Sequence, residues 1–393
     1  MVIVVPPRIR SRAHTRSEYA WPDLPFRPFH MTRKKTTFLL KRFIPPWMRG
    51  VGLCAAAGAI CSLLHTPLPW MIGPLLAMAA AKLFGVDVGA PKNGRESGQL
   101  LIGCTLGLYF TPVVMGLLWS HALLMLLAAV LAIVLGYICA FFLARVSGID
   151  KTTALFASMP GGATEMAVLG EHHGARIDKV AFAQSLRILL VVVIVPSVLT
   201  LSGAHGADQF QAAPGSVSYS GLALLLSLCA AGGWVLSKLK VPNAWMLGPL
   251  FVSIVVTGTE VGLSAMPKGL SNLGQLLLGC ALGSRFEQNF MRSARRFVFG
   301  VTASITLAIV LSAVFAVVLA WLGGIPLPTM ILAIAPGGIG EMGITAKVLQ
   351  LGVPLVTAFH VTRIVLLVTT TAPLVNGTQR MAARFKSRRL RKK

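Results

Sequence analysis

The stretch ASMPGGATEM, residues 157–166, places a proline, two glycines and an acid inside an apolar run. A second stretch, AIAPGGIGEM, repeats this pattern at residues 333–342. Proline removes a backbone donor, and glycine permits dihedral angles outside the helical region. Because unpaired backbone cannot face lipid, a break in a membrane helix has to lie against protein or a water-filled cavity. Each stretch therefore predicts a broken helix at a functional position.

The composition of the chain indicates a polytopic membrane protein. Of its 393 residues, 55% are hydrophobic and only 12% are charged, which is about half the charged fraction of a soluble domain. Residues 297–322 form an uncharged apolar run of 26 residues, and residues 122–144 form one of 23. Since about 20 residues cross a bilayer, several segments are long enough to be transmembrane helices.

The net charge of +24 is concentrated at the two ends of the chain. Of the 36 Lys and Arg residues, 11 lie in residues 1–50 and 8 in residues 380–393. Basic segments resist translocation, so we expect both termini to be cytoplasmic in a bacterial-type inner (plasma) membrane. The tail at 1–44 is expected to be disordered and that at 377–393 to be a basic cytoplasmic tail. No DNA-reading fold accompanies them, so nucleic acid is not an expected partner.

Several motifs occur twice at nearly one spacing, which indicates an internal duplication. WMIGPL at residue 70 returns as WMLGPL at 245, and GQLLIGCTLG at 98 returns as GQLLLGCALG at 274. The two PGG motifs and a later arginine, Arg187 or Arg363, also repeat, with offsets of 175 or 176. The chain thus divides into a first repeat, 45–202, an external linker, 203–217, and a second repeat, 218–376.

The Lys and Arg pattern predicts that the two repeats are inverted. If each PGG segment enters and leaves the membrane on one side, each repeat has five full spans and the basic loops become cytoplasmic, with Lys268 the clear exception. The predicted fold is therefore an all-α integral membrane protein with about ten transmembrane helices and two re-entrant segments. The expected spans are 48–64, 69–85, 98–119, 121–144, 179–201, 220–237, 244–260, 272–284, 297–322 and 355–375, with re-entrant segments at 152–171 and 328–350.

Two acids make the PGG segments candidates for a binding site. Of the twelve acidic residues, only Glu165 and Glu341 lie deep in predicted membrane segments, where an ionisable group is costly and often functional. Paired broken helices in inverted halves are the usual indication of a transporter's substrate or ion site. The predicted site contains Pro160, Gly161, Gly162, Glu165, Arg187, Pro336, Gly337, Gly338, Glu341 and Arg363, with Gln99, Gln275, Gln184 and His360 as further candidates.

Each of these side chains also has a structural interpretation. Arg187 and Arg363 each follow the acid of their own repeat by 22 residues, so each could simply neutralise it and fix the packing. The glutamines and His360 could form interhelical hydrogen bonds. Helix N-termini with arginines would suit an anion, whereas two carboxylates would suit a cation or a proton. The sequence is compatible with either charge.

No metal site, cofactor or catalytic residue is expected. The cluster EHHG at 171–174 resembles a ligand set, but adjacent histidines on a helix point about 100° apart, which suits chelation poorly. The six cysteines form no CxxC motif and lie in apolar segments, as buried small hydrophobic residues do.

The repeated PGG-x-x-EM, GQLL-GC-LG and WM-GPL motifs resemble the membrane AbrB family. The resemblance covers about residues 48–376 and includes both copies of the duplicated domain. Members of this family carry names such as ammonia monooxygenase and AbrB family transcriptional regulator, so the resemblance implies a link to regulation of gene expression. A monooxygenase would need several converging His or carboxylate ligands, and the chain offers no such set.

The sequence therefore predicts a secondary transporter or permease for a small molecule or ion. The alternatives are a membrane-bound monooxygenase and a membrane regulator that does not transport. Besides the solute, the expected partner is the lipid bilayer, and a homo-oligomer is compatible with the sequence.

Overall fold

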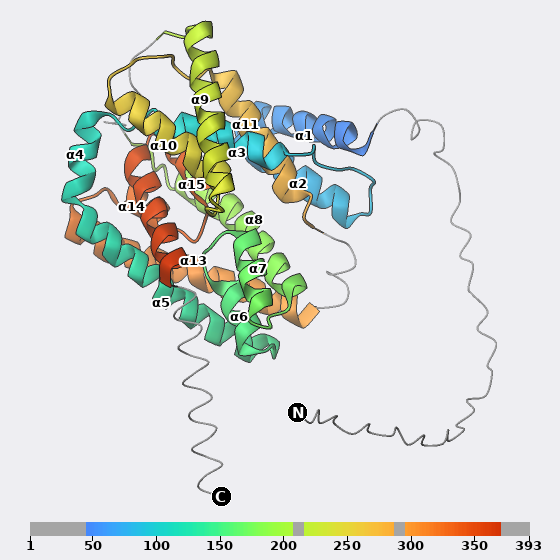
Figure 1. The fold of residues 1–393 in the computed structure, drawn as a ribbon. Helices are drawn as coiled ribbons and strands as arrows, with labels where there is room; N and C mark the ends of the chain where they lie inside the picture. Colours follow the sequence, from blue (N-terminus) through green and yellow to red (C-terminus); the bar gives the residue numbers. More distant parts are fainter. Residues whose placement is uncertain (1–44, 207–215, 287–294, 371–393) are drawn as a thin grey trace, which may run out of the picture. The chain divides into compact units, whose positions relative to one another are not determined.

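The computed structural model describes residues 45–206, 216–286 and 295–370, and all regular elements within these ranges are helices (Figure 1). The predicted tails at 1–44 and 377–393 and most of the linker lie outside the described residues. The prediction of an all-helical protein is confirmed for the part of the chain that is described.

The first repeat contains two long helices and several shorter ones. A proline at the first turn begins α1, α2 and α4, where the missing N–H costs nothing and the fixed φ suits the helix. The Asp150 side chain caps α6 by accepting a hydrogen bond from the Thr153 amide at 2.7 Å. The helices are α1 (Pro46–Leu63), α2 (Pro69–Leu83), α3 (Gly94–Gly107), α4 (Pro112–Ser120), α5 (Ala122–Ser147), α6 (Lys151–Ser158), α7 (Ala163–His172) and α8 (Ile177–Leu201).

The second repeat follows the same order. Its helices are α9 (Tyr219–Lys238), α10 (Ala244–Gly258), α11 (Lys268–Gly283), α13 (Arg295–Gly323), α14 (Leu327–Ile334), α15 (Ile339–Val348) and a last helix, Val353–Thr370.

Five of these helices are long and apolar enough to cross a membrane: α5, α8, α9, α13 and Val353–Thr370. Large apolar side chains on α5 and α13 are exposed, among them Phe141 and Phe299, as expected for helices that face lipid. The predicted straight span at 98–119 is wrong, because α3 and α4 meet at an angle of 89°. Counted together, this bent pair raises the number of candidate spans to six, so the total of ten stays a prediction.

The first two helices of each repeat pack on the third helix of the other repeat. A Cβ added at Gly103 of α3 would lie 2.5 Å from the Met246 carbonyl oxygen of α10, and one at Gly279 of α11 would lie 2.6 Å from that of Met71 in α2. Helices α3 and α11 also cross, with Gly98 against the Gly274 carbonyl oxygen at 2.9 Å. The glycines recurring in the GQLL motifs therefore permit backbone contact between repeats.

Helices α5 and α13, which are equivalent in the two repeats, lie side by side and run antiparallel. His121, just before α5, contacts the Gly323 carbonyl oxygen at the end of α13 through Nε2 at 3.3 Å. At the opposite end, Nε of Arg296 donates to the Val146 carbonyl oxygen at 3.0 Å. Since α6 starts just after α5 and α14 just after α13, the two PGG segments begin at opposite ends of this helix pair.

The first PGG segment turns back on itself. The amide of Arg176, just before α8, donates to Oγ1 of Thr153 in α6 at 2.9 Å. A Cβ added at Gly170 of α7 would lie 3.3 Å from the ring of Phe156 in α6. The end of α7 therefore lies beside the beginning of α6. In the second repeat α14 and α15 also contact one another.

Candidate functional site

Both PGG stretches interrupt a helix, as the sequence predicts. Between α6 and α7, Met159 (φ −62°, ψ 131°) and Gly162 (φ −65°, ψ 135°) have extended backbone. Between α14 and α15, Ala335 (φ −51°, ψ 144°) and Gly338 (φ −93°, ψ 164°) do the same. The conformational reason for the glycines is wrong, because none of the four in the two motifs has a positive φ and any residue adopts these angles.

The second glycine of each motif is required for space instead. A Cβ at Gly162 would overlap the carboxylate of Glu165, and one at Gly338 would overlap that of Glu341. Each glutamate is the third residue of its helix, the position from which an acid folds back towards the helix start. The carboxylate then lies near the positive end of the helix dipole. Glycine therefore keeps a place for the acid beside the break.

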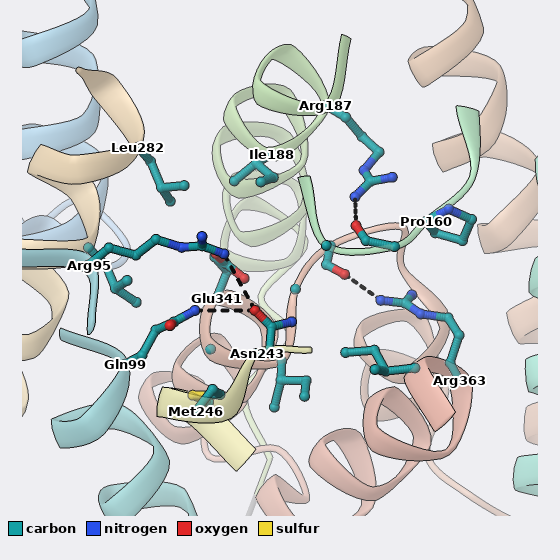
Figure 2. Close-up of a pocket in the computed structure, with 18 residues that line it drawn as sticks. Arg95, Gln99, Pro160, Arg187, Ile188, Asn243, Met246, Leu282, Glu341 and Arg363 are labelled. Atoms are coloured by element: carbon teal, nitrogen blue, oxygen red, sulfur yellow. Dashed lines mark hydrogen bonds between the residues drawn. The ribbon is translucent and has the colours of Figure 1, made fainter. Parts of the chain in front are cut away.

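The two arginines bind the backbone of the breaks. Arg187 donates from Nη1 to the Met159 carbonyl oxygen at 2.7 Å and from Nη2 to that of Gly161 at 3.0 Å. Arg363 donates in the same way to the carbonyl oxygens of Ala335, at 2.7 Å, and Gly337 (Figure 2). Each arginine thus supplies donors to carbonyls that the broken helix leaves without partners.

Neither arginine forms an ion pair with a residue that the structure describes; the two ion pairs found there are Arg49–Asp87 and Arg176–Asp178. The interpretation in which Arg187 and Arg363 neutralise the acid of their own repeat is therefore wrong for this structure. Sequence separation could not distinguish a carboxylate partner from a carbonyl partner, because the two lie in the same segment.

Gln184 and His360 are fully buried and hold the ends of the first half-helices. Nε2 of Gln184 donates to the carbonyl oxygens of Phe156 at 2.7 Å and Met159 at 2.9 Å. Nε2 of His360 lies 2.9 Å from the Leu332 carbonyl oxygen and donates to it. Both make the helix-to-helix hydrogen bond of the structural interpretation, and neither is among the residues that line the cavity described next.

The two breaks meet at one cavity of ≈ 60 Å³ (Figure 2). Its polar and charged lining consists of Glu341 and Arg363 from the second repeat, Arg187 from the first, and side chains from the starts of α3 and α10. Nine of the predicted site residues line it: Gln99, Pro160, Gly161, Gly162, Arg187, Gly337, Gly338, Glu341 and Arg363. Glu165 lies next to this lining, whereas Pro336 lines two smaller cavities behind the breaks.

Asn243 links the lining to Glu165, although no sequence motif indicates it. Its Oδ1 accepts from Nη2 of Arg95 and from Nε2 of Gln99, both at 3.4 Å, and its amide donates to Oε1 of Glu165 at 3.3 Å. Asn243 has φ 52°, a left-handed conformation that asparagine tolerates well. The signal that could have found it is the repeat itself, because Leu68 occupies the equivalent place 175 residues earlier.

The cavity is therefore polar on one side and apolar on the related side. Where the first side has Arg95, Gln99 and Asn243, the offset places Ser271, Gln275 and Leu68 on the other. Leu68 is fully buried and Gln275 is 5% exposed, and neither lines the cavity.

Arg285 adds positive charge near the polar side. It follows the last residue of α11, and burial lowers its pKa to about 10, with a further decrease from Arg95. Glu165, Glu341 and Glu96 act in the opposite direction and raise this pKa. At neutral pH the guanidinium is still charged, so the cavity lies in a region of positive charge balanced in part by three acids.

Comparison with known proteins places the chain in a family. The family model described as "Transition state regulatory protein AbrB" matches residues 70–378, which include both PGG motifs and both arginines. The chain belongs to the AbrB family. It is 28% identical over 351 residues to "Uncharacterized protein YhjN" of Bacillus subtilis (strain 168), covering 82% of this chain and 90% of the relative. It is 26% identical over 306 residues to "Putative regulator AbrB" of Escherichia coli (strain K12), covering 76% and 87%.

The candidate metal ligands of this AbrB-family chain do not converge. Among the described residues, no group of three or more His, Cys, Asp or Glu side chains is placed to hold a metal ion. In the EHHG cluster, His173 contacts the Leu169 carbonyl oxygen through Nδ1 at 2.8 Å and packs against the Phe156 ring with 5.7 Å between ring centroids.

Two glycines two residues apart allow a matched test of the folded-back glutamate. Gly338→Ala should destabilise the protein by about 1–2 kcal/mol, because the new methyl group displaces the Glu341 carboxylate. Gly340→Ala should be neutral or stabilising by about 0.5 kcal/mol, since its Cβ would meet nothing closer than 3.6 Å. Thermal unfolding of the purified variants compares them. Equal stability of the two variants would mean that Glu341 does not lie over the break.

Proposed function

We propose that this AbrB-family protein is a secondary transporter of a small solute that works by alternating access. The observation that carries the proposal is the meeting of two broken helices, one from each repeat, at a single cavity lined by Arg187, Arg363 and Glu341. Discontinuous helices of this kind supply backbone groups and dipole ends to a solute near the middle of the membrane. Their backbone would be costly in lipid and is useful only where something binds.

The antiparallel contacts support an inverted arrangement of the repeats. Equivalent helices α5 and α13 run in opposite directions, and the PGG segments begin at opposite ends of that pair. If α5 and α13 span the bilayer, one segment enters from each side. Related halves that enter from opposite sides can exchange roles, which would close the cavity on one side and open it on the other.

The polar side of the cavity is proposed to face the cytoplasm. Its residues lie at the start of α3, the start of α10 and the end of α11, next to the basic loops that the sequence places inside. The described state would then be open inwards, with the apolar side around Leu68 closed.

The name of the Escherichia coli relative suggests a second role in regulation. A transporter whose conformational state is sensed by another component would fill that role without a DNA-reading domain of its own. Transport is the primary proposal because the geometry of the breaks supports it directly.

Reconstitution tests the transport proposal even though the solute is unidentified. Full-length protein in proteoliposomes would be exposed to the low-molecular-weight fraction of a bacterial extract, and accumulated solutes identified by mass spectrometry. We expect at least one solute to accumulate above protein-free liposomes and to be lost in Gly338→Leu, whose side chain would fill the break. A folded protein that accumulates no solute above the protein-free control would contradict the proposal.

The proposed orientation predicts opposite labelling of two exposed positions. In a background lacking the six native cysteines, Ser202→Cys after α8 should react with an impermeant maleimide in intact cells. Lys238→Cys, at the end of α9, should react only after the membrane is permeabilised, because basic loops stay cytoplasmic. Both residues are exposed. Labelling of both positions from outside would contradict the inverted arrangement.

A further inference from the structure

We propose that the transported solute is a small oxyanion, held between the guanidinium groups of Arg187 and Arg363 and the starts of α7 and α15. This inference rests on the transport function proposed above and assigns the charge that the sequence leaves open. It depends on what the arginines bind, on the two uncapped helix starts, on the charges in the lining and on the size of the cavity.

The first step is that both arginines keep donors available inside the protein. Arg187 is 5% exposed and Arg363 is 4% exposed, and both line the cavity. Each has five N–H donors and uses one from each terminal nitrogen to bind a carbonyl of its break. In the described part of the chain Nε of each arginine is buried without a hydrogen-bond partner. Unused donors on a buried guanidinium are suited to oxyanions, which accept bidentate hydrogen bonds.

The second step is that the carbonyl bonds leave the charge of both arginines in place. A carbonyl oxygen supplies a partial charge only, and no carboxylate pairs with either guanidinium among the described residues. Burying such a charge is costly unless something of opposite sign approaches it. A bound anion would provide that compensation.

The third step is that two helix starts add to the same positive region. Helices α7 and α15 have ten residues each, and Gly162 and Gly338 at their N-caps provide no side-chain capping bond. Both glycines line the cavity. The free amides and the dipole of a helix start favour an anion, so these termini and the arginines act in the same direction.

The fourth step is the balance of charges. Three arginines, Arg95, Arg187 and Arg363, and one acid, Glu341, line the cavity (Figure 2). The other acid, Glu165, accepts from the Asn243 amide through Oε1. A cation would have to enter next to the arginines, which are fixed by their carbonyl bonds. An anion, by contrast, is opposed by Glu341 alone, so neutralising Glu341 should strengthen its binding.

The last step is size. A cavity of ≈ 60 Å³ has room for about four water molecules, since one needs roughly 10–15 Å³ by the same measure. Nitrate, bicarbonate and acetate each have four heavy atoms and match this space. The shared chemistry is a planar, delocalised oxyanion, and the inorganic and organic forms are separate arms of the test.

The test is ligand-dependent thermal unfolding of the purified full-length protein. Sodium nitrate, sodium bicarbonate and sodium acetate would be compared with sodium chloride at equal ionic strength, and ammonium and methylammonium chloride would serve as cationic probes. A ligand that binds only the folded state raises the melting temperature. We expect at least one oxyanion to do so and neither cation.

Two variants then fix the sign of the site, and a third is the control. Glu341→Gln should bind the oxyanion several-fold more tightly, and Arg363→Lys about tenfold more weakly, because a point charge replaces the bidentate fork. Glu171→Gln, which removes an exposed acid on α7, should leave affinity unchanged. If Arg363→Lys does not fold, Glu341→Gln still decides, since a cation site predicts that this change abolishes binding.

Stabilisation by ammonium or methylammonium that is lost in Glu341→Gln would overturn the anion assignment. The absence of any effect of the three oxyanions would overturn it as well. Transport is tested separately: a protein that binds oxyanions without moving them contradicts only the transporter proposal. A protein that accumulates a cation contradicts only the anion site.

Discussion

Arg363→Gln is expected to destabilise the folded protein by roughly 3–5 kcal/mol. The change removes the donors to the carbonyl oxygens of Ala335 and Gly337 in a buried break, and each unsatisfied buried carbonyl costs about 1–3 kcal/mol. Denaturant or thermal unfolding in detergent measures the loss. Arg176→Gln is the matched control, since it breaks an exposed ion pair with Asp178 and should cost less than about 1 kcal/mol.

The double variant Glu341→Gln with Arg363→Gln decides what the arginine is for. If the two side chains formed a buried ion pair, removing both charges would restore most of the stability. We expect no recovery, because the carbonyls of the break remain without donors whatever happens to the acid. Recovery to near the wild-type stability would show that the pair matters more than the carbonyl bonds.

Gly279→Val is expected to have an effect of similar size, at least about 3 kcal/mol or loss of folded protein. A Cβ at this position would lie 2.6 Å from the Met71 carbonyl oxygen and 3.2 Å from the Leu75 amide nitrogen. These are backbone atoms of α2, so a larger side chain must separate two helices. Gly269→Val in the same helix is the control, because nothing lies within 4 Å of that position.

The same reasoning applies to the other repeat. Gly103→Val should destabilise α3 against α10 as Gly279→Val does α11 against α2, because the two contacts are equivalent. Expression level and melting temperature in detergent compare the three variants. If Gly279→Val is as stable as Gly269→Val, the close packing between the repeats is not as described.

The sequence was sufficient to predict the breaks and most helix positions. The predicted spans 179–201 and 220–237 agree with α8 and α9 to within two residues, since long uncharged runs bounded by polar residues have few alternatives. The PGG stretches mark the breaks because proline cannot continue a helix. At 98–119, in contrast, the apolar run continues through the bend, and only Pro112 indicates that a new helix begins.

The contacts of the site depend on tertiary structure that a single sequence does not contain. Arg363 lies 22 residues after an acid, but it folds onto carbonyls that lie in the same broken segment. Asn243 has no motif of its own and reaches Glu165 only through the packing of the repeats. The role of Gly338 also needs coordinates, because its backbone angles are ordinary and its missing side chain is what matters.

Alternating access can be tested most directly at two glutamines that are equivalent in the repeats. Gln99 lines the cavity, whereas Gln275 is 5% exposed. In a protein without native cysteines, Gln99→Cys should therefore react with a small maleimide and Gln275→Cys should react slowly. Saturating transported solute should change the two rates in opposite directions, lowering that at 99 and raising that at 275. Rates that stay fixed, or that fall together, under all solute conditions would contradict alternating access at the crossed breaks.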